Sequence, residues 1–164
     1  IPTGLSDEEW DATVNGAYAI YDNNEANNTT YGKLYNWYAV NTGKLCPQGW
    51  HIPIDAEWSQ MITYLNIRPA GKLKAIGNNT DGSGLWSSPN LDATNESGFT
   101  GLPGGYLYSN GTFDNVGKFA YWWSNSEYEV FGQAFGFFVH YNTESATKTN
   151  NLKLQGLSCR CLKD

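Results

Sequence analysis

The 164-residue sequence is poor in charged side chains, which make up 16% of it. Ten lysines and arginines face sixteen aspartates and glutamates, so the net charge is −6. Nucleic-acid binding needs a face rich in lysine and arginine, and this balance therefore argues against a nucleic-acid partner. Scarce lysine and glutamate, with asparagine as frequent as glycine, also disfavour long helices and favour turns and short strands.

Long apolar runs are absent as well. No stretch approaches the roughly 18 apolar residues that a membrane-spanning helix needs, so we expect no membrane span. The N-terminus lacks the pattern of a signal peptide, and Ile1-Pro2 resembles the start of a mature or trimmed chain. A chain of this length suits one domain over residues 1–164 that buries roughly two-thirds of its unfolded surface.

The three cysteines and two histidines do not have the spacing of a zinc site. His51 lies in a tight turn between Trp50 and Pro53, where we expect a structural histidine with satisfied hydrogen bonds. His140 falls in an alternating strand pattern that favours exposure and contact with a ligand. No carboxylate lies at a spacing that suggests acid–base catalysis with it.

Aromatic residues are abundant: seven Trp, eleven Tyr and seven Phe. Aromatics combined with Asn, Ser and Gly are typical of adaptable recognition surfaces such as antibody loops. The glycines of the segment 98–105 lack the spacing and the strand–helix context of a phosphate loop. We therefore expect them to allow tight backbone turns beside bulky rings.

Periodicity places helices in the first half of the chain and strands in the second. The clearest helix follows Pro53, with apolar residues at i, i+3, i+4 and i+7 from Trp58 to Leu65. The acidic run Asp7–Glu9 indicates a solvated helix start. Further patterns predict a strand at 17–21, a helix at 32–40 and a short helix at 70–76.

Short strands are predicted from residue 98 onward, at 119–124, 133–141, 147–149 and 154–162. Asn110-Gly111 between two short apolar segments is the strongest hairpin signal. Helices followed by a strand-rich half predict an α+β domain.

Five ordered blocks of the sequence resemble the Fibrobacter succinogenes major paralogous domain. They are 31–40, 46–53, 98–106, 121–127 and 156–164, with Trp-Trp-Ser in the fourth and Cys-Arg-Cys in the last. That family lies within the C-type-lectin-like group, which includes formylglycine-generating enzymes and variable proteins of diversity-generating retroelements. The resemblance implies two main helices, small twisted antiparallel sheets and extensive loops. It also implies a family strand that would precede residue 1 and is missing here.

The resemblance further implies a disulfide between Cys46 and Cys161, with a fully reduced chain as the alternative. Cys159 is then expected to be a buried free thiol. The disulfide would place the protein outside the cytoplasm, extracellularly or on a cell surface. The residues expected in the core are Trp37, Trp50, Trp58, Phe99, Trp123 and Leu157.

Metal and enzyme chemistry are not expected. The Glu-Pro-Asn and Trp-Asn-Asp motifs of calcium-binding lectins are missing, and Trp123-Ser124-Asn125 is a poor match to the second, so Ca²⁺ is unsupported and no cofactor is predicted. Cys159 and Cys161 have the wrong spacing for the reactive pair of a formylglycine-generating enzyme.

The segment 133–141 breaks strict alternation. Either its strand is buried on both faces, or it carries an exposed aromatic patch that marks a contact surface. In the variable proteins that this segment resembles, this part of the fold displays the ligand-facing residues. Residues 130–151 are also rich in the types that adenine mutagenesis of Asn codons produces. The candidate ligand-binding residues are Tyr121, Asn125, Tyr128, Phe131, Phe135, Phe137, His140 and Thr147.

Together these features predict a non-enzymatic ligand-binding module with an aromatic, retroelement-diversified surface in its C-terminal third. Its ligand would be a protein or carbohydrate on a cell or phage surface. The alternatives are a carbohydrate-binding or adhesion module of a bacterial surface protein, an enzyme of the formylglycine-generating type, and a purely architectural domain.

Overall fold

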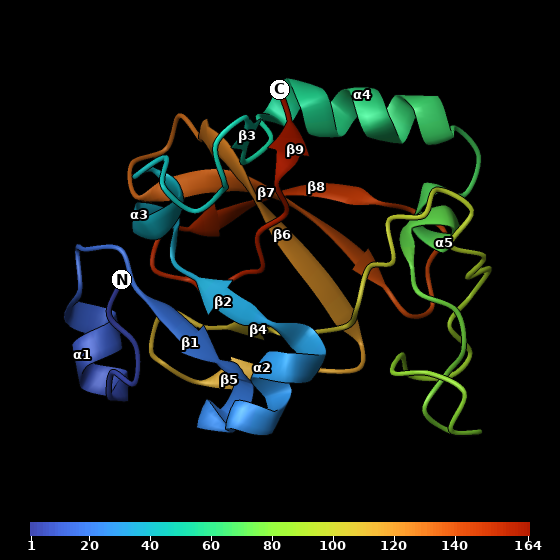
Figure 1. The fold of residues 1–164 in the computed structure, drawn as a ribbon, viewed down its shortest axis with the longest axis horizontal. Coiled ribbons are helices and arrows are strands. Elements are labelled where there is room, and N and C mark those ends of the chain that lie inside the picture. The colour runs from blue at the N-terminus through green and yellow to red at the C-terminus, as the bar shows by residue number, and fades with distance from the viewer.

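The computed structural model describes all of residues 1–164 and has the mixed α+β architecture expected from the sequence. Its strands are β1 (Tyr18–Ile20), β2 (Lys33–Tyr35), β3 (Trp50–His51), β4 (Tyr106–Leu107), β5 (Phe113–Asp114), β6 (Phe119–Glu127), β7 (Gln133–His140), β8 (Thr147–Leu152) and β9 (Leu162–Lys163). They form four small antiparallel sheets, β1–β2, β3–β9, β4–β5 and β6–β7–β8 (Figure 1). The β4–β5 pairing confirms the predicted Asn-Gly hairpin.

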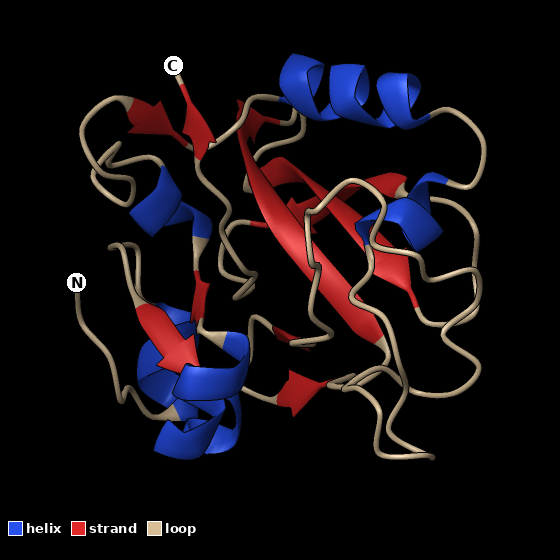
Figure 2. Ribbon diagram, turned by 45° about the vertical axis from the view of Figure 1, so that its right-hand side comes forward, coloured by secondary structure: helices blue, strands red, loops and turns tan.

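The helices are α1 (Asp7–Ala12), the 3₁₀ turn η1 (Tyr21–Asn23), α2 (Glu25–Tyr31), α3 (Trp37–Val40), α4 (Asp55–Leu65) and α5 (Pro69–Leu73). The acidic run does begin α1, where Ser6 and Glu9 form a reciprocal capping box. α4 is the predicted clearest helix and has 11 residues. No helix combines the length and apolarity needed to cross a membrane. Loops make up much of the rest, including most of the stretch between α5 and β4 (Figure 2).

The structure corrects the sequence predictions between residues 25 and 40. The segment predicted as a helix at 32–40 splits into strand β2 and the short helix α3. Asn36 causes the break, because its side-chain oxygen accepts hydrogen bonds from the backbone of Ala39 (3.1 Å) and of Ala17 (2.9 Å), which caps α3 and holds the chain beside β1. The helix α2 was not predicted from its Asn- and Thr-rich sequence.

The β6–β7–β8 sheet has two faces whose residues alternate along each strand. Trp122 on β6 pairs with Phe137 on β7, and both point toward α4. The next pair along, Tyr121 with Phe138, therefore points the opposite way. We call the first surface the α4 face, formed by Ala120, Trp122, Phe137 and Val139.

The α4 face is closed by stacked rings. Trp58 on α4 lies 5.4 Å from Phe137 and 6.1 Å from Trp122 between ring centroids. Phe99 from the long loop meets Trp122 edge-on at 5.0 Å. Trp58, Trp122 and Phe137 belong to the largest buried cluster of the molecule and Phe99 packs against it, so α4 and the sheet share one hydrophobic core.

The C-terminal segment runs between the sheets. Gly156, Leu157 and Ser158 form isolated bridges to three different elements, to Leu107, Tyr35 and Trp122. A regular strand at 154–162 was therefore a wrong prediction, because successive residues bond to different partners. Only Leu162–Lys163 form a strand, β9, at the end of this path.

A disulfide joins Cys46 to Cys161 across 115 residues and fixes the C-terminal segment near β3. Trp50 on β3 was expected in the core, but 44% of it is exposed. The β3–β9 pair lies at the edge of the molecule, where the Trp50 ring has little to cover it. Of the other expected core residues, Trp37, Trp58, Trp123 and Leu157 are buried and Phe99 is partly buried.

Candidate binding surface

The side of the sheet opposite α4 carries a continuous group of six partly exposed rings. We call this group the open face. Its members come from the β4–β5 hairpin and from β6 and β7: Tyr106, Tyr108, Phe119, Tyr121, Phe138 and His140.

Each ring of the open face touches the next. Ring centroids lie 4.8 Å apart between Tyr106 and Tyr108, and 5.1 Å apart between Tyr106 and Tyr121. Tyr121 continues to Phe138 at 5.1 Å and to Phe119 at 5.5 Å. The group therefore forms one apolar surface with tyrosine hydroxyls at one end.

The hairpin joins this surface through the backbone. The N–H of Gly105 donates to the carbonyl of Phe119 at 3.0 Å, which sets β4 beside β6. A Cβ at Gly105 would lie only 2.4 Å from the carbonyl oxygen of Asp114, and its φ of +64° favours glycine. Along β4 the side chains then alternate, with Leu107 buried in a separate cluster and Tyr108 39% exposed.

Three tyrosine hydroxyls gather at the hairpin end. The Tyr108 hydroxyl donates to Asp114 at 3.4 Å, and Asn115 donates its amide N–H to the Tyr106 hydroxyl at 3.4 Å. Burial raises the pKa of Tyr121 to about 12, with a smaller contribution from the nearby Tyr108. Burial likewise raises the pKa of Tyr106. These two hydroxyls stay neutral at physiological pH and can both donate and accept hydrogen bonds.

His140 lies at the other end of the open face, with its ring 4.2 Å from that of Phe119. Burial lowers the pKa of His140, and the cationic Lys74 and Lys118 lower it further. The neutral imidazole is therefore favoured at pH 7, and one ring nitrogen donates while the other accepts.

A buried lysine, Lys74, binds the backbone at the His140 end of the open face. The Lys74 side chain is fully buried, and its ammonium donates to the carbonyls of Leu91 (2.8 Å) and His140 (3.2 Å). Two longer bonds reach the carbonyls of Tyr141 and Thr143. Burial lowers the Lys74 pKa to about 8. The Lys74 ammonium thus binds backbone carbonyls at the end of β7 and just after it. No carboxylate accepts a hydrogen bond from it.

The structure divides the sequence-predicted residues into two sets. Tyr121 and His140 belong to the open face, and Thr147 lies beside it because it pairs with Phe138 across β7 and β8. Asn125 is exposed at the far end of β6, where its backbone N–H donates to Pro53 at 2.9 Å. It lies away from the six rings.

The remaining predicted residues lie on the α4 side of the sheet or at the β6–β7 turn. Phe137 is 4% exposed, so expecting it on a contact surface was wrong, because α4 covers it. Phe135 packs against Tyr128 at 5.1 Å and lies under the Lys148 ammonium at 3.7 Å. Phe131 is fully exposed at the turn and touches no open-face ring.

Sequence reasoning missed four members of the open face, Tyr106, Tyr108, Phe119 and Phe138. Alternation along the extended segment 106–108 would have grouped Tyr106 with Tyr108. Alternation along β6 would have grouped Phe119 with Tyr121. What alternation cannot supply is the register between β6 and β7, which joins these pairs to Phe138 and His140.

Two observations concern metal-binding groups and the cysteines. No group of three or more His, Cys, Asp or Glu side chains is placed to hold a metal ion. Cys46 and Cys161 are joined to each other, which leaves Cys159 as the free cysteine. Burial raises the pKa of the Cys159 thiol, so the nucleophilic thiolate is disfavoured.

The fold and this surface define an α+β domain, tied by a disulfide, whose main sheet is sealed on the α4 side and carries six partly exposed rings on part of the other side. The model of the Fibrobacter succinogenes major domain matches residues 3–163. The chain belongs to this family. Neither the curated proteins nor the solved structures offer a match.

Proposed function

We propose that this protein is a non-enzymatic binding module whose partner docks on the open face. The observation that carries the proposal is the unbroken contact of six partly exposed rings on a sheet whose other side is sealed. Contiguous exposed aromatic surface on a protein usually marks an interaction site. Tyrosine and phenylalanine also give large contact area for the loss of few rotatable bonds.

A protein is the partner class that this geometry favours. The principal cavities of the molecule lie elsewhere, so the open face is a broad surface rather than a pocket for a small ligand. Rings held by a sheet and by each other are preorganised, which lowers the entropic cost of binding. The tyrosine hydroxyls, Asp114 and His140 would supply hydrogen bonds around the apolar area.

The finer parts of the proposal extend the family membership. We propose that the domain adopts a C-type-lectin-like fold and acts extracellularly or on a cell surface. The disulfide supports that location, because such bonds persist in oxidising compartments. We also propose retroelement diversification of the C-terminal third, with Thr147 and His140 among the altered positions. A neighbouring reverse transcriptase gene with an adenine-differing copy of the final coding segment would support diversification, and its absence would contradict it.

Carbohydrate binding in an adhesion module is the second candidate. The observation in its favour is the group of neutral hydroxyls beside Asp114 and flat rings, which resembles the mixture of stacking and hydrogen bonding that sugars need. Catalysis of the formylglycine-generating type has less support, since the free thiol of Cys159 is partly buried and its raised pKa disfavours the thiolate.

The decisive experiment measures binding of the labelled domain to intact bacterial and epithelial cells by flow cytometry. Tyr108→Ala and Tyr121→Ala should each weaken binding, while Val14→Ala, which truncates an apolar side chain 73% exposed outside the open face, should not. Protease treatment of the cells should abolish binding to a protein partner, and periodate oxidation should abolish binding to a sugar. Equal binding by the open-face variants and the wild type would refute the proposal.

A further inference from the structure

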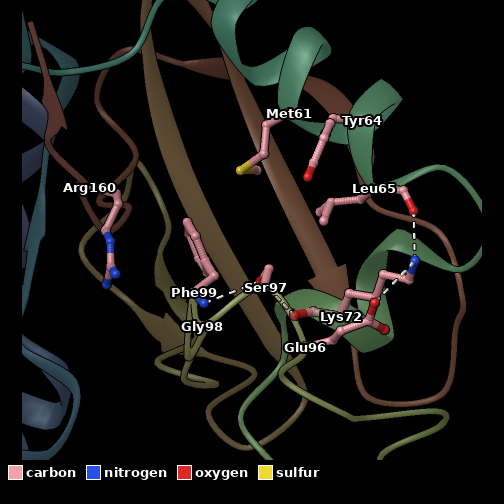
Figure 3. A pocket seen from close by; sticks show the side chains of 9 residues that line it. All are labelled: Met61, Tyr64, Leu65, Lys72, Glu96, Ser97, Gly98, Phe99 and Arg160. Atoms are coloured by element: carbon pink, nitrogen blue, oxygen red, sulfur yellow. Dashed lines mark hydrogen bonds and ion pairs between the residues drawn. The ribbon is translucent and has the colours of Figure 1, made fainter.

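A groove on the α4 side of the molecule provides a second candidate site. It has a volume of about 770 Å³ and lies between α4 and the loop at 96–99 (Figure 3). A smaller hollow of about 200 Å³ adjoins it, and the two share Met61, Phe99 and Arg160. The volume of the groove is within the range of small-molecule sites in proteins.

The floor of the groove is apolar and rigid. Figure 3 shows Met61 and Leu65 reaching down from α4 toward Phe99 on the opposite wall. Phe99 is fixed by edge-on contacts with Trp58 at 6.1 Å and with Trp122 at 5.0 Å. The floor is therefore a continuation of the core and does not need to be ordered by a ligand.

The Arg160 side chain lies next to these apolar residues, and its guanidinium has no carboxylate partner. Its guanidinium carbon lies 4.7 Å from the centre of the Phe99 ring. It makes no ion pair, whereas Arg68, Lys148 and Lys153 all pair with carboxylates. An arginine fork stacked on a ring and lacking an anion presents its N–H donors to solvent.

The opposite end of the groove is polar. Lys72 and Glu96 lie 3.9 Å apart, too far for a hydrogen bond, so each keeps capacity for another partner. Lys72 also donates to the carbonyl of Leu65 at 3.0 Å, which holds its ammonium in place. The exposed ring of Tyr64 forms part of the wall.

We propose that this groove binds an acidic saccharide, with Arg160 holding the carboxylate of a uronic-acid unit. The carbon–hydrogen face of the sugar ring packs on Phe99 and Met61. Lys72 and Glu96 exchange hydrogen bonds with its hydroxyls. A saccharide fits better than an apolar acid because polar side chains line the groove beside its apolar residues, namely Lys72, Glu96, Ser97 and Arg160. It fits better than an extended peptide because the backbone N–H groups of Ser97 and Phe99 already donate to the Lys72 carbonyl and to the Ser97 hydroxyl.

Titration calorimetry with trigalacturonate tests the proposal, with galactotriose as the neutral counterpart. We expect trigalacturonate to bind and galactotriose to bind at least tenfold more weakly. Arg160→Met should weaken trigalacturonate binding by about tenfold or more, since a charge-assisted bidentate contact is lost. Arg160→Lys should give an intermediate loss, because it keeps the charge without the planar fork.

Lys163→Met is the matched control. It removes the same charge from the neighbouring strand β9, outside the groove, and should leave the affinity unchanged. Tyr64→Ala, a second groove variant, should also weaken trigalacturonate binding. Circular dichroism verifies that each variant is folded. No trigalacturonate binding, equal binding of galactotriose, or an equal loss in Lys163→Met and Arg160→Met would overturn the proposal. The open-face variant Tyr108→Ala should bind trigalacturonate as the wild type does, so this result stands apart from the open-face proposal.

Discussion

The two faces of the β6–β7–β8 sheet are built from alternate residues of the same strands, yet they have opposite fates. On the α4 face, Trp122 and Phe137 are 6% and 4% exposed beneath Trp58. On the open face, Tyr121 and Phe138 remain partly exposed. Aromatic content alone does not separate the faces. On one side α4 covers the rings. On the other side the buried cluster around Trp123 and Leu157 covers one part of the sheet and leaves the open-face rings for the partner proposed above.

The chemistry of the two faces follows the same division. The rings of the α4 face are tryptophan and phenylalanine, which gain most from burial. The open face contains three tyrosines and a histidine, whose polar atoms can remain hydrated beside an apolar ring. Substitutions on the two faces should therefore affect different measurements.

The largest effect is expected on the α4 face. Trp58→Ala removes a 3% exposed ring from between α4 and the sheet, and should lower the free energy of unfolding by about 3–5 kcal/mol. Urea denaturation measures this loss. Tyr108→Ala, the comparison on the open face, should cost less than about 1 kcal/mol. Similar losses in the two variants would remove the distinction between the faces.

The disulfide should have the next largest effect. Converting Cys46 and Cys161 to serine releases the C-terminal segment, which packs Leu157 beside Trp123 in a buried cluster. The loss of unfolding free energy should be about 4 kcal/mol, at the upper end of the usual range, because the disulfide closes a loop of 115 residues. Thermal unfolding with and without reductant measures it, and Cys159→Ser is the control that keeps the crosslink. A wild type indifferent to reductant would contradict this prediction.

Binding should be most sensitive on the open face. Tyr121→Phe removes one hydroxyl and keeps the ring, whereas Tyr121→Ala removes both. We expect the alanine variant to lose about tenfold in affinity for the cell-surface partner and the phenylalanine variant to lose less, because ring burial dominates at such surfaces. Flow cytometry at graded protein concentrations gives both values. An equal loss in the two variants would shift the weight of the interaction to the hydroxyl.

The lowered pKa of Lys74 should make the free energy of unfolding depend on pH. Its native pKa of about 8 lies below the ordinary value of 10.5, so between these values the unfolded chain holds a proton that the native protein has lost. Stability should therefore rise with pH in this window by about 1 kcal/mol or more. Lys74→Met should lack this rise. Comparing urea midpoints of the two proteins at pH 7.5 and 9.5 isolates Lys74 from the tyrosines, and parallel pH profiles would refute the prediction.

The smallest effect concerns His140. Its native pKa is lowered, so the imidazole stays neutral until the pH falls below the ordinary histidine range. Partner binding should weaken only on further acidification, by a few-fold, as the ring gains a charge within the aromatic group. His140→Gln should bind with little dependence on pH. His51 has the opposite shift, since Asp164 and Glu57 raise its pKa, and it lies away from the open face. A pH dependence retained in His140→Gln would assign the effect to another group.

Local patterns in the sequence were reliable where one element decides the outcome. The i, i+3, i+4, i+7 spacing predicted α4, and Asn110-Gly111 predicted the β4–β5 hairpin, because both depend on residues close in the chain. The helix predicted at 32–40 was wrong because Asn36 bonds to Ala17, 19 residues away. The strand predicted at 154–162 was wrong for a similar reason, since Leu157 and its neighbours bond to distant strands.

The sequence by itself determined the α+β class, the family, the aromatic character of the C-terminal third and the cysteines that could join. Only the tertiary structure decided which rings meet water. The strand pattern predicts that Phe137 and Phe138 point to opposite sides of the sheet. Phe137 is buried because α4 packs on its side. The tertiary structure also decided that the β4–β5 hairpin brings Tyr106 and Tyr108 beside Tyr121. The physical reason is that burial depends on what packs over a residue, and that partner is often far away in the chain.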